Sequence, residues 1–324
     1  MFSKNLNYGR LLNDFLQFKR ECGYKYKTEE DILKAFYRYT QTHEESKLGL
    51  TRKFMEQWSR PKIKESRKSV SNRVSVLREF ALYLNRLGYK AYQPAQIKNA
   101  RNKSFIPYVF SKEEIDTIFH EIDHYPDSSR NRYNSNEVYP VLFRVLYGCG
   151  LRISEALNLK IKDMDTITGR IEIYMAKNNT QRVVMMSKSL RKICHCYKTH
   201  CLVSKNDNTT FFQHKEGSVR SITQVNKYFR TILYRAKIPY FGRGKGPYLH
   251  NLRHTFACHS FYQMHKDGLD MNVSLPILSN YLGHSTIRTT ERYLKLTQSL
   301  FGELVSQMTD SYSSLYREVI FEKE

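Results

Sequence analysis

The sequence predicts a mainly α-helical protein with one small β-hairpin, divided into a helical N-terminal domain and an α+β C-terminal domain. Apolar residues recur at helical spacing through most of the 324 residues. Only one pair of alternating stretches, 170–177 and 181–187, flanks turn-forming residues, as a hairpin requires. An aperiodic segment with prolines, 94–108, separates the two parts. We therefore predict domains at 1–105 and 106–324.

Four amphipathic helices are expected in the first domain. Pro61 ends the third apolar pattern and Gly88 ends the fourth. The four stripes are Leu11, Leu12, Phe15, Leu16 and Phe18; Ile32, Leu33, Phe36 and Tyr37; Phe54, Met55 and Trp58; and Val70, Val74, Leu77, Phe80, Ala81, Leu84 and Leu87.

The second domain begins with a helix start signal. Ser111 followed by Glu114 forms a capping box ahead of an apolar stripe. A second helix, 138–146, stops at two glycines, and the hairpin follows it. Helical patterns then continue to the C-terminus, where Phe301, Leu304, Val305 and Met308 begin a last apolar stripe.

The charge of the chain indicates a polyanionic partner. Lys and Arg number 53 against 31 Asp and Glu, a formal net charge of +22. Between residues 52 and 103 there are 14 Lys or Arg and 3 Asp or Glu, which favours a surface facing phosphates. A basic protein without such a partner, or one that binds a membrane surface, is the alternative that charge alone leaves open.

The six cysteines predict neither disulfides nor a metal site. The segment CHCYKTHC, 194–201, resembles a metal-binding cluster but has the period of a helix, and its Cys and His side chains fall on different faces. The N-terminus does not resemble a signal peptide, and no apolar run is long enough to span a membrane. We therefore expect a cytoplasmic protein with reduced thiols and no contact with a membrane.

Three short segments carry the candidate chemistry. They are GCGLRISEALNL, HNLRHTFACH from residue 250, and LSNYLGHSTIRTTERY, which ends at residue 293. Each alone is compatible with a structural role. In this order and spacing they resemble the tyrosine recombinases, also called the phage integrase family. The resemblance covers about 111–296, and NRVSVLREFALYLNRLGY is similar to the core-binding domain of the family, a helical SAM-like domain.

The resemblance implies an enzyme that cuts and rejoins DNA at specific sites through a 3′-phosphotyrosyl intermediate, with strand exchange through a Holliday junction. Arg152 and Arg253 would bind the scissile phosphate through bidentate donors. His250 would accept the tyrosine proton or bind the phosphate, and His284 would hydrogen-bond the phosphate.

The nucleophile and the general acid complete the implied set. Tyr293 would attack phosphorus, and Lys177, at the hairpin position of the family, would protonate the leaving oxygen. Lys160 and Lys162 precede the hairpin and fit this role less well. Glu155 has two possible roles: an acidic residue that orients the arginine or histidine of the site, or a surface residue of a helix. Asn251 stands where relatives often carry Asp.

This chemistry needs neither a metal nor a nucleotide cofactor, because the phosphotyrosyl bond conserves the energy of the broken bond. The expected partners are double-stranded DNA, other protomers in a tetrameric synaptic complex, and accessory recombinase or DNA-bending proteins. Two other functions are possible: a non-catalytic helix-turn-helix regulator with Gly283 in its turn, and a type IB topoisomerase. The tail after residue 300 would pack on its own domain or dock on a neighbouring protomer.

Overall fold

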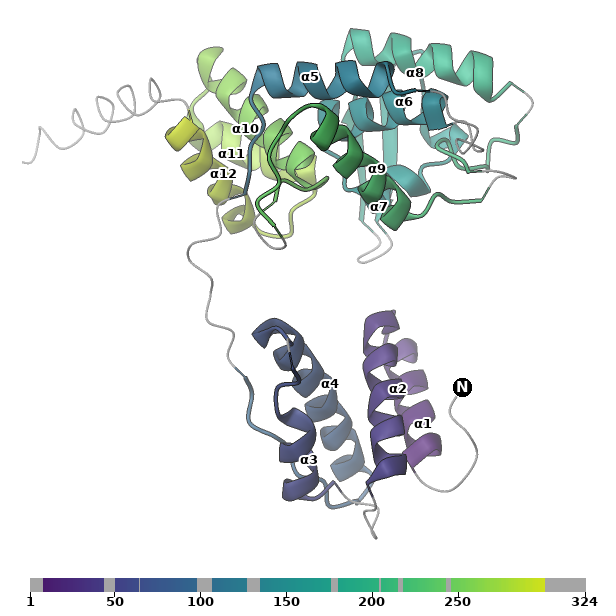
Figure 1. The fold of residues 1–324 in the computed structure, drawn as a ribbon, viewed down its shortest axis with the longest axis vertical. Helices are drawn as coiled ribbons and strands as arrows, with labels where there is room; N and C mark the ends of the chain where they lie inside the picture. The colour runs from purple at the N-terminus through teal and green to yellow at the C-terminus, as the bar shows by residue number, and fades with distance from the viewer. Residues whose placement is uncertain are drawn as a thin grey trace, which may run out of the picture. The chain divides into compact units, whose positions relative to one another are not determined.

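The computed structural model describes residues 8–43, 50–63, 65–97, 107–126, 135–175, 180–203, 205–214, 218–242 and 246–300. The chain forms two compact units, Met1–Ser104 and Phe105–Glu324, and each contains its own hydrophobic core (Figure 1). Within the described residues, the prediction of a mainly helical chain with one two-stranded sheet is confirmed.

The first unit contains four helices: α1 (Tyr8–Glu21), α2 (Lys27–Thr42), α3 (Arg52–Ser59) and α4 (Arg67–Arg86). The helix α2 packs on α1 and α4, and α3 packs on α4. Most residues of the predicted apolar stripes are buried in this unit, and Ile32 and Tyr37 are partly buried against its core. Two residues near helix ends are exposed: Phe18 at 37% and Leu87 at 51%. Leu87 caps α4, so its side chain has already left the packed face.

The second unit is formed by α5 (Lys112–Asp123), α6 (Ser135–Gly148), α7 (Ile153–Asn158), the 3-10 helix η1 (Ile161–Asp163), β1 (Arg170–Met175), β2 (Thr180–Met185), α8 (Lys188–Cys201), α9 (Ile222–Arg235), α10 (Asn251–Lys266), α11 (Met271–Leu282) and α12 (Ile287–Leu300). The predicted capping box is present at the start of α5, where Ser111 and Glu114 each accept the backbone N–H of the other at 2.9–3.1 Å.

The hairpin strands pair antiparallel, in register from Arg170 opposite Met185 to Met175 opposite Thr180. One face of the hairpin is buried by Ile171, Ile173 and Val184. Since opposed residues share a face, Arg182, opposite Ile173, lies on this inward side. The hairpin therefore directs a charged side chain toward the interior of the unit.

Three C-terminal helices form a compact group. The helix α10 packs against α6, α11 and α12, and α11 also contacts α12 and β2. Figure 1 shows α10, α11 and α12 together at one end of the second unit. Four of the six candidate catalytic residues lie on these helices or on the turns beside them: His250, Arg253, His284 and Tyr293.

The segment CHCYKTHC forms the end of α8, with Cys194 and Tyr197 buried and Cys196 and His200 exposed. Across the part of the chain that the structure describes, no three His, Cys, Asp or Glu side chains gather as metal ligands would. No helix in that part is both long enough and apolar enough to cross a membrane.

Candidate active site

The structure brings five of the six predicted site residues together. Arg152 lies at the start of α7, and His250 and Arg253 lie at the start of α10. His284 lies in the turn after α11, and Tyr293 lies on α12. Hydrogen bonds and ring contacts link these residues. The sixth, Lys177, lies outside the described residues, between the two hairpin strands.

Arg253 is the most deeply buried of these side chains, with 2% of its surface exposed. Its guanidinium donates to the carbonyls of Gly150 and Leu282, both at 2.6 Å. Burial, followed by the nearby charge of Arg152, lowers the pKa of Arg253 to about 10, so the group stays charged at neutral pH. Gly150 has φ +59°, and a Cβ there would lie 2.3 Å from Phe256. Glycine therefore suits this position, because any other residue would be strained at this φ and would displace the ring of Phe256.

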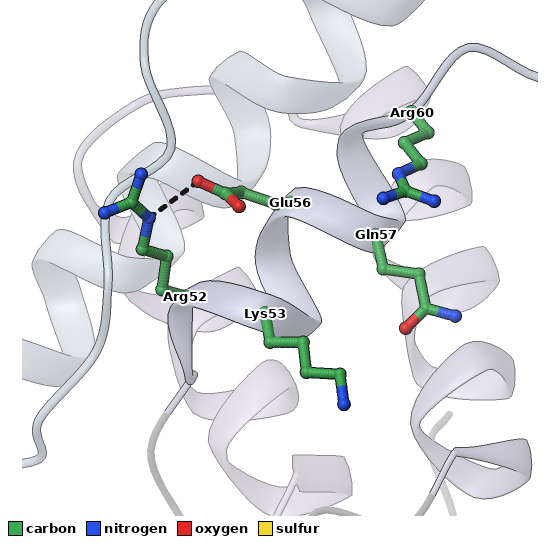
Figure 2. A pocket seen from close by; sticks show the side chains of 5 residues that line it. All are labelled: Arg52, Lys53, Glu56, Gln57 and Arg60. Carbon is green, nitrogen blue, oxygen red and sulfur yellow. Dashed lines mark hydrogen bonds and ion pairs between the residues drawn. The ribbon is translucent and has the colours of Figure 1, made fainter.

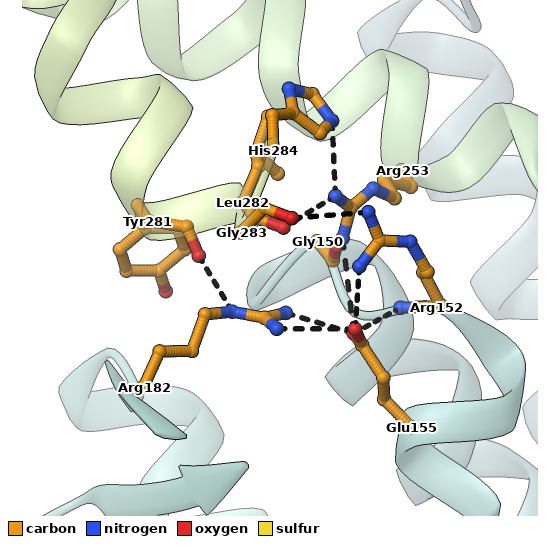
Figure 3. Close-up of polar contacts among 9 residues, drawn as sticks. All are labelled: Gly150, Arg152, Glu155, Arg182, Arg253, Tyr281, Leu282, Gly283 and His284. Atoms are coloured by element: carbon orange, nitrogen blue, oxygen red, sulfur yellow. Dashed lines mark hydrogen bonds and ion pairs between the residues drawn. The ribbon is translucent and has the colours of Figure 1, made fainter. Parts of the chain in front are cut away.

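Arg152 lies at the N-terminal end of α7 and keeps 34% of its side chain exposed. It donates to Glu155 at 2.7 Å and to the carbonyl of Gly283 at 3.2 Å. Gly283 ends α11 in the left-handed conformation, with φ 64°. This helix end thus turns the carbonyls of Leu282 and Gly283 toward the two arginines (Figure 3).

Glu155 connects three arginines. It accepts two hydrogen bonds from Arg182, at 2.8 and 3.1 Å, and its carboxylate lies 3.9 Å from Arg253. Burial opposes its ionisation, but the hydrogen bonds and charge of Arg182, then the hydrogen bonds from Arg152, outweigh burial and lower its pKa to about 2. The carboxylate therefore stays ionised and offsets part of the positive charge of the site.

Arg182 was missed as a site residue by sequence reasoning. It extends from β2 and also donates from Nε to the carbonyl of Tyr281 at 3.0 Å (Figure 3). The available signal was the hairpin pattern, which places Arg182 on the apolar face, where a charged residue needs a partner. Its partner could not be identified from the sequence.

His250 and His284 are held in the uncharged state. His284 contacts Thr290 through Nδ1 at 2.8 Å and Arg253 through Nε2 at 3.2 Å. Burial, then Arg253 and Arg152, lowers the pKa of His284 to about 4, and the same causes lower the pKa of His250 to about 4. A neutral His284 would accept from Arg253 at Nε2 and donate from Nδ1 to Thr290.

Tyr293 lies on α12 and is 3% exposed. Its ring is nearly parallel to that of His284, with centroids 6.0 Å apart. Its hydroxyl forms a 3.0 Å hydrogen bond with Nδ1 of His254, a residue of α10 that sequence reasoning did not select. The only sequence signal was its place next to Arg253 in HNLRHT.

The structure explains why residue 251 is Asn rather than Asp. Its side chain is buried; Oδ1 accepts from the backbone N–H of Tyr248, and Nδ2 donates to the carbonyl of Tyr108, both at 2.7 Å. An aspartate could accept the first bond but could not donate the second. The asparagine therefore fixes the segment before α5 to the start of α10.

Comparisons with known proteins identify the family of the chain. The model of the phage integrase family matches residues 109–299. The chain belongs to the phage integrase family. Among curated relatives, a putative integrase/recombinase of Sinorhizobium fredii is 24% identical, with 92% of this chain and 95% of that protein covered. Tyrosine recombinase XerC of Oceanobacillus iheyensis is 28% identical, with 74% of this chain and 73% of the relative covered.

Two solved structures share the fold of this family member. A lambda integrase dimer bound to a COC′ core site aligns with a TM-score of 0.64 at 15% identity, covering 88% of this chain and 94% of that one. XerH recombinase bound to its difH substrate, in a post-cleavage complex, aligns with a TM-score of 0.61 at 22% identity, covering 86% and 78%.

Proposed function

We propose that this tyrosine recombinase cuts and rejoins double-stranded DNA at specific sites through a 3′-phosphotyrosyl intermediate, exchanging strands through a Holliday junction. The observation that carries the proposal is the convergence of Arg152, Arg253 and His284 beside the phenol of Tyr293. A phosphodiester under attack gains negative charge on its non-bridging oxygens. Two permanently charged forks fixed in place are suited to stabilise it.

Each residue takes one role in this reaction. Tyr293 attacks phosphorus, and Lys177 protonates the leaving 5′ oxygen. Arg152 and Arg253 bind the non-bridging oxygens, and His284 and His250 hydrogen-bond the phosphate. Because the phosphotyrosyl bond conserves the energy of the broken bond, the step uses neither a nucleotide nor a metal ion.

The first unit would hold the DNA as a core-binding domain. Its helix α3 carries a pocket lined by Arg52, Lys53, Glu56, Gln57 and Arg60 (Figure 2). Lys53 and Arg60 are exposed, whereas Arg52 donates to Glu56 at 2.8 Å. Together with the local charge excess, this pocket is suited to bind a phosphate backbone.

The partners follow from the same proposal. Of the solved proteins with this fold, XerH recombinase is bound to its difH substrate and lambda integrase is a dimer bound to a COC′ core site. We infer specific DNA sites, a tetrameric synaptic complex of this chain, accessory recombinase or DNA-bending proteins, and action in the cytoplasm.

The test is covalent capture on a nicked suicide substrate that carries the target site. Tyr293→Phe should abolish the denaturation-resistant adduct and leave specific DNA binding nearly unchanged, because the ring supplies most of the packing. Tyr234→Phe removes a hydroxyl from a residue that is 84% exposed and should behave as wild type. An adduct formed by the Tyr293→Phe variant would identify another nucleophile.

The same assay separates the other functions. A helix-turn-helix regulator would form no adduct, and a type IB topoisomerase would relax DNA without exchanging strands between two sites. The structure disfavours the regulator because the turn between α11 and α12 points carbonyls at Arg152 and Arg253, inside the unit.

A further inference from the structure

We infer that His254, not His250, accepts the proton of Tyr293 when the phenol attacks DNA; this inference rests on the proposed function. The hydroxyl of Tyr293 lies 3.0 Å from Nδ1 of His254, within the range of a direct proton transfer. The two rings are tilted by 50° with centroids 5.5 Å apart. A phenol with an ordinary pKa of about 10 needs such a base near neutral pH.

The geometry around His254 supports this role. It follows Arg253 on α10 and lies one turn after His250, whose ring is 4.7 Å away at 83°. His254 is partly buried, and Tyr293 is fixed on α12 by a core that includes Ala257 and Cys258. The packing of α10 on α12 therefore holds the two side chains next to each other.

The other two histidines are less suited to the task. Both ring nitrogens of His284 contact other side chains, Thr290 and Arg253. The pKa of His250 is lowered to about 4 by desolvation and by the arginines, which makes its free form a weak base. These observations leave His250 available to hydrogen-bond the phosphate.

The step balances as follows. The O–H bond of Tyr293 breaks, its proton moves to Nδ1 of His254, and the phenolate electron pair forms the bond to phosphorus. The bond from phosphorus to the 5′ oxygen breaks, and that oxygen takes a proton from Lys177. In religation the 5′ hydroxyl attacks phosphorus and returns its proton to Lys177, the bond from phosphorus to the Tyr293 oxygen breaks, and the leaving phenolate recovers its proton from His254. For Nδ1 to accept the proton, the neutral imidazole ring of His254 must carry its single N–H on Nε2.

Two substitutions separate proton transfer from positioning. His254→Ala removes both the base and the hydrogen bond. His254→Asn keeps an acceptor on the side chain but provides no base at neutral pH. In full-length protein, both variants should bind DNA as wild type does and form the adduct about 10²- to 10⁴-fold more slowly. The matched control is His259→Asn on the same helix, where Nδ1 of His259 lies 2.9 Å from the hydroxyl of Tyr147; cleavage should be unchanged.

The deciding measurement places a fluorinated tyrosine, with a more acidic phenol, at position 293. If His254 takes the proton, the fluorinated tyrosine should raise the cleavage rate of His254→Ala by at least about 10-fold. It should raise the cleavage rate of Arg152→Lys only slightly, because that variant still has its proton acceptor. Wild-type cleavage by either His254 variant, or no recovery with the fluorinated phenol, would overturn the inference. Failure of the proposed function looks different: either the wild-type protein would form no adduct, or an adduct would persist in Tyr293→Phe.

Discussion

At the residue scale, the protonation states around Glu155 define the site. One ionised carboxylate lies among Arg152, Arg182 and Arg253, and two histidines beside them are held neutral. The net positive charge is concentrated on arginines, which do not titrate near neutral pH. A phosphate entering the site would therefore meet charge that is independent of pH.

The neutral histidines predict loss of stability in weak acid. The pKa of His284 is about 4 in the folded protein against an ordinary 6.5. Between these values the unfolded chain binds the extra proton, so stability is complete above pH 6.5 and falls toward pH 4. The contribution of Glu155 is lost only below its ordinary value of 4.5, toward about 2.

We therefore expect the melting temperature of the DNA-free protein to fall between about pH 7.5 and about pH 5. In His284→Asn the fall should be smaller by about 2–4 °C, the equivalent of roughly 1 kcal/mol in a unit of this size. The control is His120→Asn, which replaces a histidine that is 66% exposed. Its melting temperature should fall by as much as that of the wild type. Equal falls in all three proteins would mean that His284 is not held neutral.

At the element scale, the hairpin is anchored to the site by one side chain. Arg182 joins β2 to Glu155 on α7 and to the carbonyl of Tyr281 on α11. The proposed general acid, Lys177, follows β1 and precedes β2 in the sequence and is outside the described residues. We therefore expect Arg182 to act as a positioning residue for the hairpin.

We expect Arg182→Met to release the hairpin without unfolding the unit, because Glu155 keeps its bonds to Arg152. Cleavage should fall by about 100-fold, the effect of misplacing a reacting group by about 1 Å. DNA binding should be retained, and amide hydrogen exchange in 170–185 should become faster. Arg170→Met removes an arginine whose side chain is 53% exposed on the same hairpin and should change neither measurement. Unchanged exchange in Arg182→Met would refute the anchoring role.

At the scale of the whole molecule, the proposed recombination would require several copies of this chain to act together. Residues 301–324, where the sequence predicts an apolar stripe, lie outside the described residues. Tyr293 lies on α12, the last described helix, so a protomer that bound the following segment would act close to the nucleophile. The stripe is the best candidate for a link between protomers.

Deletion from Gly302 onward should then spare binding to a single DNA site and abolish both synapsis and recombination, because docking on a neighbour contributes nothing to one-site binding. Gel mobility on one site and on paired sites measures the two effects separately. A truncated protein that recombines normally would refute the link, and one that melts far below wild type would show that the tail packs on its own domain.

The sequence by itself determined the helices, the hairpin and the identity of the catalytic candidates. Apolar periodicity and capping residues act within a few positions, so α5, α8 and the strands could be predicted locally. Three motifs in order identified Arg152, His250, Arg253, His284 and Tyr293, which the structure then brought together.

Only the tertiary structure decided the connections among them. Arg182 reaches Glu155 across 27 positions, Arg152 reaches Gly283 across 131, and His254 meets Tyr293 across 39. No local period encodes such pairs, because they depend on how α10, α11, α12 and the hairpin pack. The partner of a buried charge, and the histidine that faces the nucleophile, are consequences of that packing.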